Sequence, residues 1–424
     1  MTMAAHSPIA GAGPRARGTF LVMATMLVAL PLIAIQGPAH TTPMDAVNAA
    51  FLALYWGWLL SRREKMFFPL VLPFWLIQLG SCTGLYTADE RLRAVLTVVE
   101  DLYLYVWYVT LTHFLTRRCR IEDVATVFIA VACGVAFLTV ADAHLGLFGG
   151  RFAGTKRATG TFENPNMFGD YLVVSFFICW AAAAAAGRRL FYLGLPLLGL
   201  GVLSTHSNGC LVSLIGGCGV TVAAYRSFWK PKQLGTVLVL GGALLGIVGV
   251  FHDQLQQVAV QRFSGSRSEV GGAALKGASE RLPIWENILK LVWQNPGGIG
   301  PGNLADVEAA TTGDKHSAHS EYLGMLAERG FFGLAGWFGI LGALFLMLGR
   351  IRTAAAAGFR PLGVEQLYGL FGALAAHALV IELSHFRHTW IVFAIITAAA
   401  MQAVARTAGD GSRPRLAPLF AEAA

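Results

Sequence analysis

The sequence predicts an all-α membrane protein that crosses the bilayer about twelve times. Of its 424 residues, 55% are hydrophobic and only 13% are charged, whereas soluble proteins carry roughly a quarter charged residues. Long apolar runs recur along the chain, and basic residues gather after every second run. These observations exclude an ordinary soluble enzyme. They also indicate that the formal net charge of +8 arises from membrane topology rather than from nucleic-acid binding.

The predicted spans are the runs long enough to cross a hydrocarbon core of about 30 Å, which takes about 20 helical residues. They lie at 19–36, 46–60, 66–84, 94–116, 124–141, 167–186, 190–204, 208–225, 234–251, 331–349, 366–384 and 388–405. The 49 glycines along the chain are typical of helices that pack closely in a membrane.

Basic residues predict the orientation, because short loops rich in Lys and Arg stay cytoplasmic. The clusters after alternate spans are Arg15/Arg17, Arg62/Arg63/Lys65, Arg117/Arg118/Arg120, Arg188/Arg189, Arg226/Lys230/Lys232, Arg350/Arg352/Arg360 and Arg406/Arg413/Arg415. Both termini are therefore predicted to be cytoplasmic. The opposite loops also hold basic residues, namely Arg91, Arg93, Arg151, Lys156, Arg157 and Arg387. Because these oppose the positive-inside bias, they need another function.

The chain divides into three predicted parts. Residues 1–251 contain the first nine spans, residues 252–330 form one long external segment, and residues 331–424 contain three spans and a cytoplasmic tail. The external segment holds or borders seven basic residues, Arg262, Arg267, Lys276, Arg281, Lys290, Lys315 and Arg329. It is the only part long enough for a structured region outside the membrane.

Two short helices are predicted in this external segment. Apolar side chains recur at helical spacing from Leu282 through Trp285, Ile288 and Leu289 to Val292, which is typical of an amphipathic helix on the membrane surface. A Pro- and Gly-rich run at 295–302 ends this helix. A second helix is expected to begin near His319 and to continue toward the tenth span.

Signatures for cofactors are missing from the sequence. The six cysteines form no C-x-x-C pair, so neither a disulfide nor a zinc site is predicted. The chain has no G-x-x-x-x-G-K-[ST] loop for nucleotide phosphates and no D-x-D in an outer loop. We therefore expect no metal and no other cofactor.

Four carboxylic acids lie within or beside predicted spans, namely Glu100, Asp101, Asp170 and Glu382. Ionised groups in a membrane are costly and usually face a cavity or a charged partner. They are predicted either to hold arginines in place or, for Glu100 and Asp101, to be half-exposed near the outer end of the fourth span.

Three segments resemble motifs of the bacterial O-antigen ligase and O-antigen polymerase superfamily, multispan enzymes that transfer glycans from a polyprenyl pyrophosphate carrier. Residues 157–169 are similar to R-x-x-G-x-F-x-N-P-N at the entrance to a span. Residues 281–285, before the glycine-rich run, are similar to the R-x-x-x-W helix. Residues 319–323 and 328–333 are similar to H-N-x-Y-L and E-x-G-x-x-G. The order of these motifs, the number of spans and the late outer loop match the family as well.

One segment departs from the family pattern. Members often have Ser-Arg-Gly at the start of the eighth span, where this chain has Ser207-Asn208-Gly209. If that arginine contacts phosphate in relatives, its role here is vacant or is filled by another basic residue such as Arg262.

The resemblance implies a GT-C-like glycosyltransferase that inverts the anomeric carbon without a metal. Arginine suits the diphosphate, because its planar guanidinium forms paired hydrogen bonds with phosphate oxygens. Histidine suits the acceptor hydroxyl, because its pKa of about 6.5 lets it accept a proton near neutral pH. We assign catalysis to His319 and Arg281, and substrate binding to Arg157, Arg262, Glu163, Asn164 and Asn166.

Structural roles remain open at several of these positions. Arg281 could face lipid phosphates, and His319 could be a helix-start residue without chemistry. Glu163, Asn164 and Asn166 could contact the substrate or could only cap the sixth span.

Three functions follow. In the first, an inner-membrane ligase moves a polysaccharide from undecaprenyl pyrophosphate onto lipid A–core at the periplasmic face, with membrane lipids as its surroundings and no nucleic-acid partner. In the second, a polymerase joins repeat units of the glycan on the carrier. In the third, the chain is a multispan transporter, for which intramembrane carboxylates are usual, although no inverted repeat is evident. The ligase is preferred because the compact length of the chain and its single long late loop are more typical of a ligase.

Overall fold

The computed structural model describes most of the chain. The described residues are 14–32, 42–153, 157–162, 164–186, 189–225, 283–312 and 318–409. Within them, all regular secondary structure is helical. The predicted all-α class is therefore confirmed.

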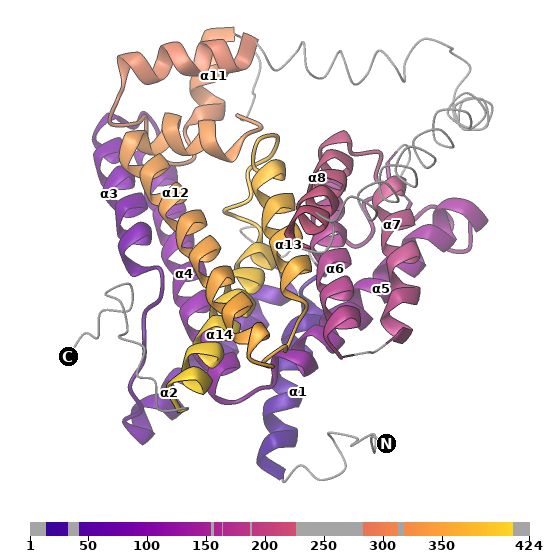
Figure 1. The fold of residues 1–424 in the computed structure, drawn as a ribbon. Helices are drawn as coiled ribbons and strands as arrows, with labels where there is room; N and C mark the ends of the chain where they lie inside the picture. The colour runs from indigo at the N-terminus through magenta and orange to yellow at the C-terminus, as the bar shows by residue number, and fades with distance from the viewer. Residues whose placement is uncertain are drawn as a thin grey trace, which may run out of the picture.

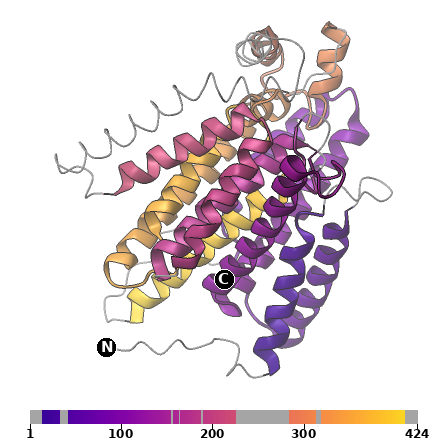
Figure 2. The same cartoon turned by 90° about the vertical axis from the view of Figure 1, so that its right-hand side faces the viewer.

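The helices form one bundle (Figures 1 and 2). They are α1 Pro14–Ala29, α2 Pro43–Arg62, α3 Val71–Thr87, α4 Arg91–Arg117, α5 Ile121–Leu145, α6 Pro165–Ala186, α7 Gly194–Ser204, α8 Asn208–Ala224, α11 Leu304–Thr312, α12 Glu321–Ala356, α13 Val364–His377 and α14 Arg387–Gly409. A short 3-10 helix, η2, covers Arg189–Leu193, and residues 283–294 are also helical.

Length and composition identify membrane-crossing helices within this bundle. Among the described residues, five helices are long and apolar enough to cross a membrane, those that begin at Arg91, Ile121, Pro165, Glu321 and Arg387. Leu190–Ser204 and Asn208–Ala224 are shorter apolar helices. Every predicted span that falls on described residues overlaps a helix. The span predicted at 234–251 lies outside the described residues.

One predicted span was too long. The apolar run at 366–384 predicts a helix that reaches residue 384, but α13 ends at His377 and a turn covers residues 378–386. The buried carboxylate of Glu321 explains the difference, because it accepts the backbone N–H groups of Leu383 and Ser384. Hydropathy registers the apolar side chains of this turn but does not reveal that a distant side chain satisfies its backbone.

Contacts gather the predicted outer loops at one end of the bundle, which we call the upper end because α11 lies at the top of Figure 1. The backbone N–H of Glu90 donates to Asn303 Oδ1 at 2.9 Å. Arg387, at the start of α14, pairs with Asp45 near the start of α2 at 2.7 Å.

The opposite, lower end of the bundle collects the predicted inner loops. Arg118, after α4, pairs with Glu64, after α2, at 2.5 Å. Arg352 donates to the carbonyl oxygen of Ala224 at 2.9 Å, which joins the lower ends of α12 and α8. The alternation of loops that the basic clusters predicted is therefore present in the packing.

Glycine lets two helix pairs approach closely. On α8 and α13, a Cβ added at Gly217 would lie 2.7 Å from the carbonyl oxygen of Gly369, and the reciprocal distance is also 2.7 Å. On α3 and α12, a Cβ added at Gly80 would lie 2.3 Å from the carbonyl oxygen of Arg329. Such contacts are typical of membrane helices, where close van der Waals packing replaces the hydrophobic effect.

A break at Gly330 divides α12. Gly330 has φ 60° and ψ −160°, a backbone conformation that only glycine adopts readily. The break frees the carbonyl groups of Ala327 and Glu328, which accept the N–H groups of Ile299 and Gly300 at 3.0 Å each. The glycine-rich turn at 295–303 is therefore held by the groups that the helix releases.

The helix at 283–294 confirms the predicted amphipathic helix but not its surroundings. Ile288 and Val292 are buried in a small core with Ile299, Leu304 and Ala327. The face predicted to lie on the membrane surface therefore packs largely against protein.

Replacement of Gly330 by Ala tests the break. A Cβ there would lie 2.4 Å from the carbonyl oxygen of Pro296 and would meet the steric penalty of this backbone conformation. We expect the unfolding free energy to fall by about 1–3 kcal/mol from the backbone strain alone. Thermal unfolding of the purified protein in detergent measures this change. Gly342→Ala, in the same helix and with nothing within 4 Å of its added Cβ, is the control, and an equal effect in both variants would contradict the explanation.

Candidate functional site

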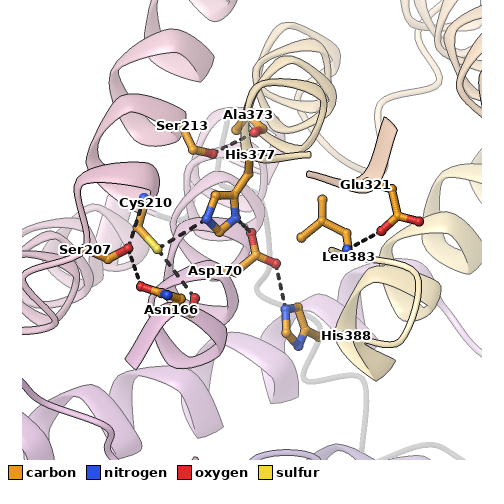
Figure 3. A network of polar contacts seen from close by, with 10 residues as sticks. All are labelled: Asn166, Asp170, Ser207, Cys210, Ser213, Glu321, Ala373, His377, Leu383 and His388. Atoms are coloured by element: carbon orange, nitrogen blue, oxygen red, sulfur yellow. Dashed lines mark hydrogen bonds and ion pairs between the residues drawn. The ribbon is translucent and has the colours of Figure 1, made fainter. Parts of the chain in front are cut away.

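Arg157 and Asn166 meet at the upper end of the bundle, beside the turn that joins α7 to α8. Arg157 Nη2 donates to Asn166 Oδ1 at 2.6 Å, and Arg157 Nε donates to the carbonyl oxygen of Thr205 at 3.0 Å. Ser207 Oγ also donates to Asn166 Oδ1, at 2.9 Å (Figure 3). Two predicted substrate-binding residues are thus brought together, and the segment that departs from the family pattern lies against them.

The charge at this position belongs to Arg157. Its guanidinium is half-buried, and burial lowers the pKa of Arg157 from a value far above neutral. Desolvation, together with the positive charge of Arg157, lowers the pKa of the nearby His206. His206 therefore favours its neutral form at neutral pH, and Arg157 supplies the positive charge.

Asn164 and Asn166 have different roles. Asn164 Oδ1 accepts the backbone N–H of Asn166 at 2.7 Å, and the carbonyl oxygen of Asn164 accepts the N–H of Phe168. Asn164 therefore caps α6, as one of the two open interpretations expected. The side chain of Asn166 is instead held by Arg157 and Ser207. Glu163 lies outside the described residues.

Other basic residues at the upper end are neutralised by carboxylates. Arg93 pairs with Asp306, and Arg387 pairs with Asp45. Arg329 Nη2 lies 2.7 Å from Asp101 Oδ2, and both side chains are buried. Within the described part of the chain, Arg157 differs from these three because its hydrogen-bond partners are neutral.

Asp101 and Glu100, near the outer end of α4, each take one of the two roles predicted for these carboxyls. Asp101 holds an arginine in place through its pair with Arg329. Glu100 is half-exposed, and its Oε2 lies 3.8 Å from His385 Nδ1.

Asp170 lies below this site between two histidines that the sequence analysis did not single out. His377 Nδ1 pairs with Asp170 Oδ1, and His388 Nε2 lies 2.8 Å from Asp170 Oδ2 (Figure 3). All three side chains are almost fully buried. The sequence indicated only that Asp170 needs a partner, because an ionisable residue inside a membrane is costly. His377, within the eleventh predicted span, and His388, at the start of the twelfth, are its partners.

His319 lies at the start of α12, close to the residue that follows His377. It is half-buried and has φ 46°, an uncommon left-handed conformation for a residue with a side chain. The N–H of Glu321 donates to the carbonyl oxygens of Ala378 and Ile381 at 2.8 and 3.1 Å. Trp285 Nε1 donates to the carbonyl oxygen of Ala318 at 3.0 Å. The segment that carries His319 is therefore fixed from both sides.

Two predicted site residues have no described placement. Arg281 and Arg262 both lie outside the described residues. Among the residues that are described, no group of three or more His, Cys, Asp or Glu side chains has a geometry that could hold a metal ion.

A comparison with known families bears on this arrangement. Residues 193–338 match the family model described as O-antigen ligase. This part of the chain is similar to the O-antigen ligase family. No curated protein matches the chain at a significant level. The matched region includes Thr205, Ser207 and His319, whereas Arg157 and Asp170 lie before it.

The carboxyl groups of Glu321, Glu328 and Glu382 interact where α12 meets the turn at 378–386. Burial, together with the negative charges of Glu328 and Glu321, raises the pKa of Glu382 to about 7, against the opposing effect of His385. Glu382 therefore changes its protonation near neutral pH.

The pair of Arg329 and Asp101 predicts strong coupling between α12 and α4. Arg329→Met leaves a buried carboxylate without its partner, and loss of one member of a buried pair typically costs about 3–5 kcal/mol. The double variant Arg329→Met/Asp101→Leu is expected to recover most of this loss, because both charges are removed. Chemical or thermal unfolding of the four proteins in detergent gives the coupling free energy. Additive losses would show that the ion pair does not stabilise the fold.

Glu382 predicts a pH dependence of stability. A carboxyl whose pKa is raised on folding stabilises the folded protein below its unfolded value of about 4.5, and this contribution is lost as pH rises through about 7. We expect the unfolding temperature of the wild type to fall between about pH 5 and pH 7 and to level off at higher pH, and to fall less in Glu382→Gln. Glu286→Gln, at an exposed carboxyl paired with Lys290, is the control. Equal pH dependence in all three proteins would contradict the assignment.

Proposed function

We propose that this protein is an O-antigen ligase that transfers a polysaccharide from undecaprenyl pyrophosphate to lipid A–core at the periplasmic face of the inner membrane. The observation that carries the proposal is the environment of Arg157. Its guanidinium is half-buried at the upper end of the bundle and, among the described residues, is held by the neutral oxygens of Asn166 and Thr205. Such an arginine keeps its positive charge for an anion.

The chemistry requires stabilisation of a leaving diphosphate. As the glycosidic bond breaks, negative charge develops on the diphosphate, and a fixed cation stabilises that charge without reorganisation. Two of the five N–H groups of Arg157 bind Asn166 and Thr205, and we assign the others to phosphate oxygens. The acceptor hydroxyl attacks the anomeric carbon from the opposite face, which inverts its configuration, and no metal takes part.

Arg157 also lies where it can replace the family arginine that is absent at Asn208. The guanidinium of Arg157 bonds the turn immediately before α8, where relatives carry the arginine that this chain lacks. We therefore assign the vacant role to Arg157 rather than to Arg262. Asn166 contributes by orienting the guanidinium, while Arg281 and Glu163 remain proposed site residues on the strength of the motifs alone.

His319 is the proposed general base for the acceptor hydroxyl. The segment that bears it is fixed by Trp285 and by the turn after His377. Because that turn follows His377, and His377 reaches the end of α6 through Asp170, the proposed base and the proposed phosphate site belong to one end of the bundle.

The distribution of basic residues supports the orientation. Arg118 and Arg352 join helix ends at the lower end, which the positive-inside rule assigns to the cytoplasm. Arg157 and His319 then face the periplasm, and both termini lie in the cytoplasm. In this arrangement residues 252–330 form the periplasmic region between the transmembrane parts 1–251 and 331–424.

Replacement of Arg157 tests the proposal in a deletion strain complemented with each variant. Arg157→Ala is expected to reduce glycan on lipid A–core by about a hundredfold, the size of effect seen when a charge-stabilising donor is lost. Arg157→Lys restores only part of it, because lysine lacks the planar fork. Arg151→Ala, at an exposed arginine in the same loop, is the control. The profile of surface polysaccharide and the pool of polyprenyl-linked glycan are the measurements.

The carrier pool separates the possible outcomes. Long glycan on the carrier with bare lipid A–core supports the ligase. Single repeat units on the carrier or on the core would indicate a polymerase instead. A normal profile in Arg157→Ala would overturn the role of Arg157, and a normal profile in the deletion strain itself would favour the transporter.

A further inference from the structure

A continuous series of contacts leads from the buried Asp170 to the half-buried Arg157. Asp170 pairs with His377, and His377 Nε2 lies 3.6 Å from Cys210 Sγ. Cys210 Sγ lies 3.5 Å from the carbonyl oxygen of Asn166, whose side chain accepts from Arg157. Figure 3 shows the thiol between the imidazole of His377 and the end of α6.

The series fits only because small residues surround it. A Cβ added at Gly169 would lie 2.5 Å from Cys210 Sγ, and one added at Gly209 would lie 3.4 Å from His377 Nε2. The thiol and the imidazole therefore fill the space where α6, α8 and α13 meet, and each constrains the position of the other.

One assignment of hydrogen-bond directions satisfies all of these contacts together. The Asp170 carboxylate only accepts, so His377 Nδ1 carries a proton. The carbonyl oxygen of Asn166 also only accepts, so the thiol of Cys210 donates to it. His377 Nε2 then bonds the sulfur only if it too carries a proton. Every atom in the series has a partner when His377 is an imidazolium.

His388 completes the charge balance. Its Nε2 donates to Asp170, while its Nδ1 has no partner among the residues that the structure describes. A protonated Nδ1 at this position would be a buried and unpaired charged donor, so His388 is neutral. The positive charge of His377 and the negative charge of Asp170 cancel, which makes their burial in the bundle acceptable.

We infer that His377, paired with Asp170, is a positioning residue that acts through Cys210 and Asn166 to hold Arg157 against the start of α8. This inference rests on the proposed function, because it makes the pair a support for the diphosphate site. Without the bond from Cys210, the start of α6 is tied to the start of α8 only through Ser207, and Asn166 holds the guanidinium less firmly.

Variants at Cys210 test the inference on the full-length protein in lipid nanodiscs, with undecaprenyl pyrophosphate as the probe. Cys210→Ala breaks the series, whereas Cys210→Ser keeps a donor and an acceptor. Loss of one such hydrogen bond is expected to weaken binding about two- to tenfold, with most of the affinity recovered in Cys210→Ser. His377→Gln is expected to weaken binding as well, and the Cys210 pair decides the question if that variant does not fold.

Ser213 provides a matched control. Ser213 Oγ donates to the carbonyl oxygen of Ala373 at 2.6 Å, so it also joins α8 to α13 but does not lead to Arg157 (Figure 3). Ser213→Ala is expected to leave the affinity unchanged. In Arg157→Ala, the further change Cys210→Ala should add no loss, because its effect passes through Arg157.

The outcomes distinguish this inference from the proposed function. If Arg157→Ala weakens binding but Cys210→Ala does not, His377 does not position Arg157, although the diphosphate site stands. Equal losses in Cys210→Ala and Ser213→Ala, or additive losses with Arg157→Ala, would show that the series only stabilises packing. If Arg157→Ala binds the probe as tightly as the wild type does, both the site and the inference are wrong.

Discussion

Compensation of buried charge governs how this bundle is assembled. A carboxylate inside a membrane protein is tolerated when a cation and hydrogen-bond donors replace its water. Asp170 on α6 obtains them from His377 at the end of α13 and from His388 at the start of α14. The pairing fixes which three helix ends meet.

A second charge pair ties α12 to α4. Arg329 lies immediately before the break at Gly330 and is buried together with Asp101 of α4. Buried backbone groups in irregular segments need hydrogen-bond partners within the protein. The carbonyl groups released at the break bind the turn at 295–303, and Glu321 binds the turn at 378–386. Both irregular segments are therefore consequences of how α12 begins.

The helices and their alternation were predictable, because each depends on local composition. Apolar length identified the spans, and basic clusters identified the shared ends. The end of α13 was not predictable, because the partner of its following turn, Glu321, lies about sixty residues earlier in the chain. The same holds for Asp170 and His377, which pair across 207 positions. Spacing within the sequence reveals neither contact.

Prediction of the site depended in the same way on whether a contact lies within one segment or joins distant segments. The motif at 157–169 singled out Arg157 and Asn166, and the structure brings them into contact within this short segment. It could not predict that Asn164 caps α6 while the side chain of Asn166 binds Ser207, because Ser207 lies in a distant segment, immediately before α8. Arg329 was counted among the external cations that need a function, and its partner Asp101 shows that its role is structural.

The contrast between Arg329 and Arg157 gives the physical basis of the site. An arginine bonded to a carboxylate forms a neutral unit with little attraction for a further anion. An arginine held by neutral oxygens keeps its full field, and partial burial strengthens that field because less water screens it. Such a group is costly unless dipoles stabilise it, and Asn166 and Thr205 supply those dipoles. In the proposed site this arrangement is prepared for a ligand of opposite charge, and the contacts of Asn166 at the start of α6 hold it in place before the ligand arrives.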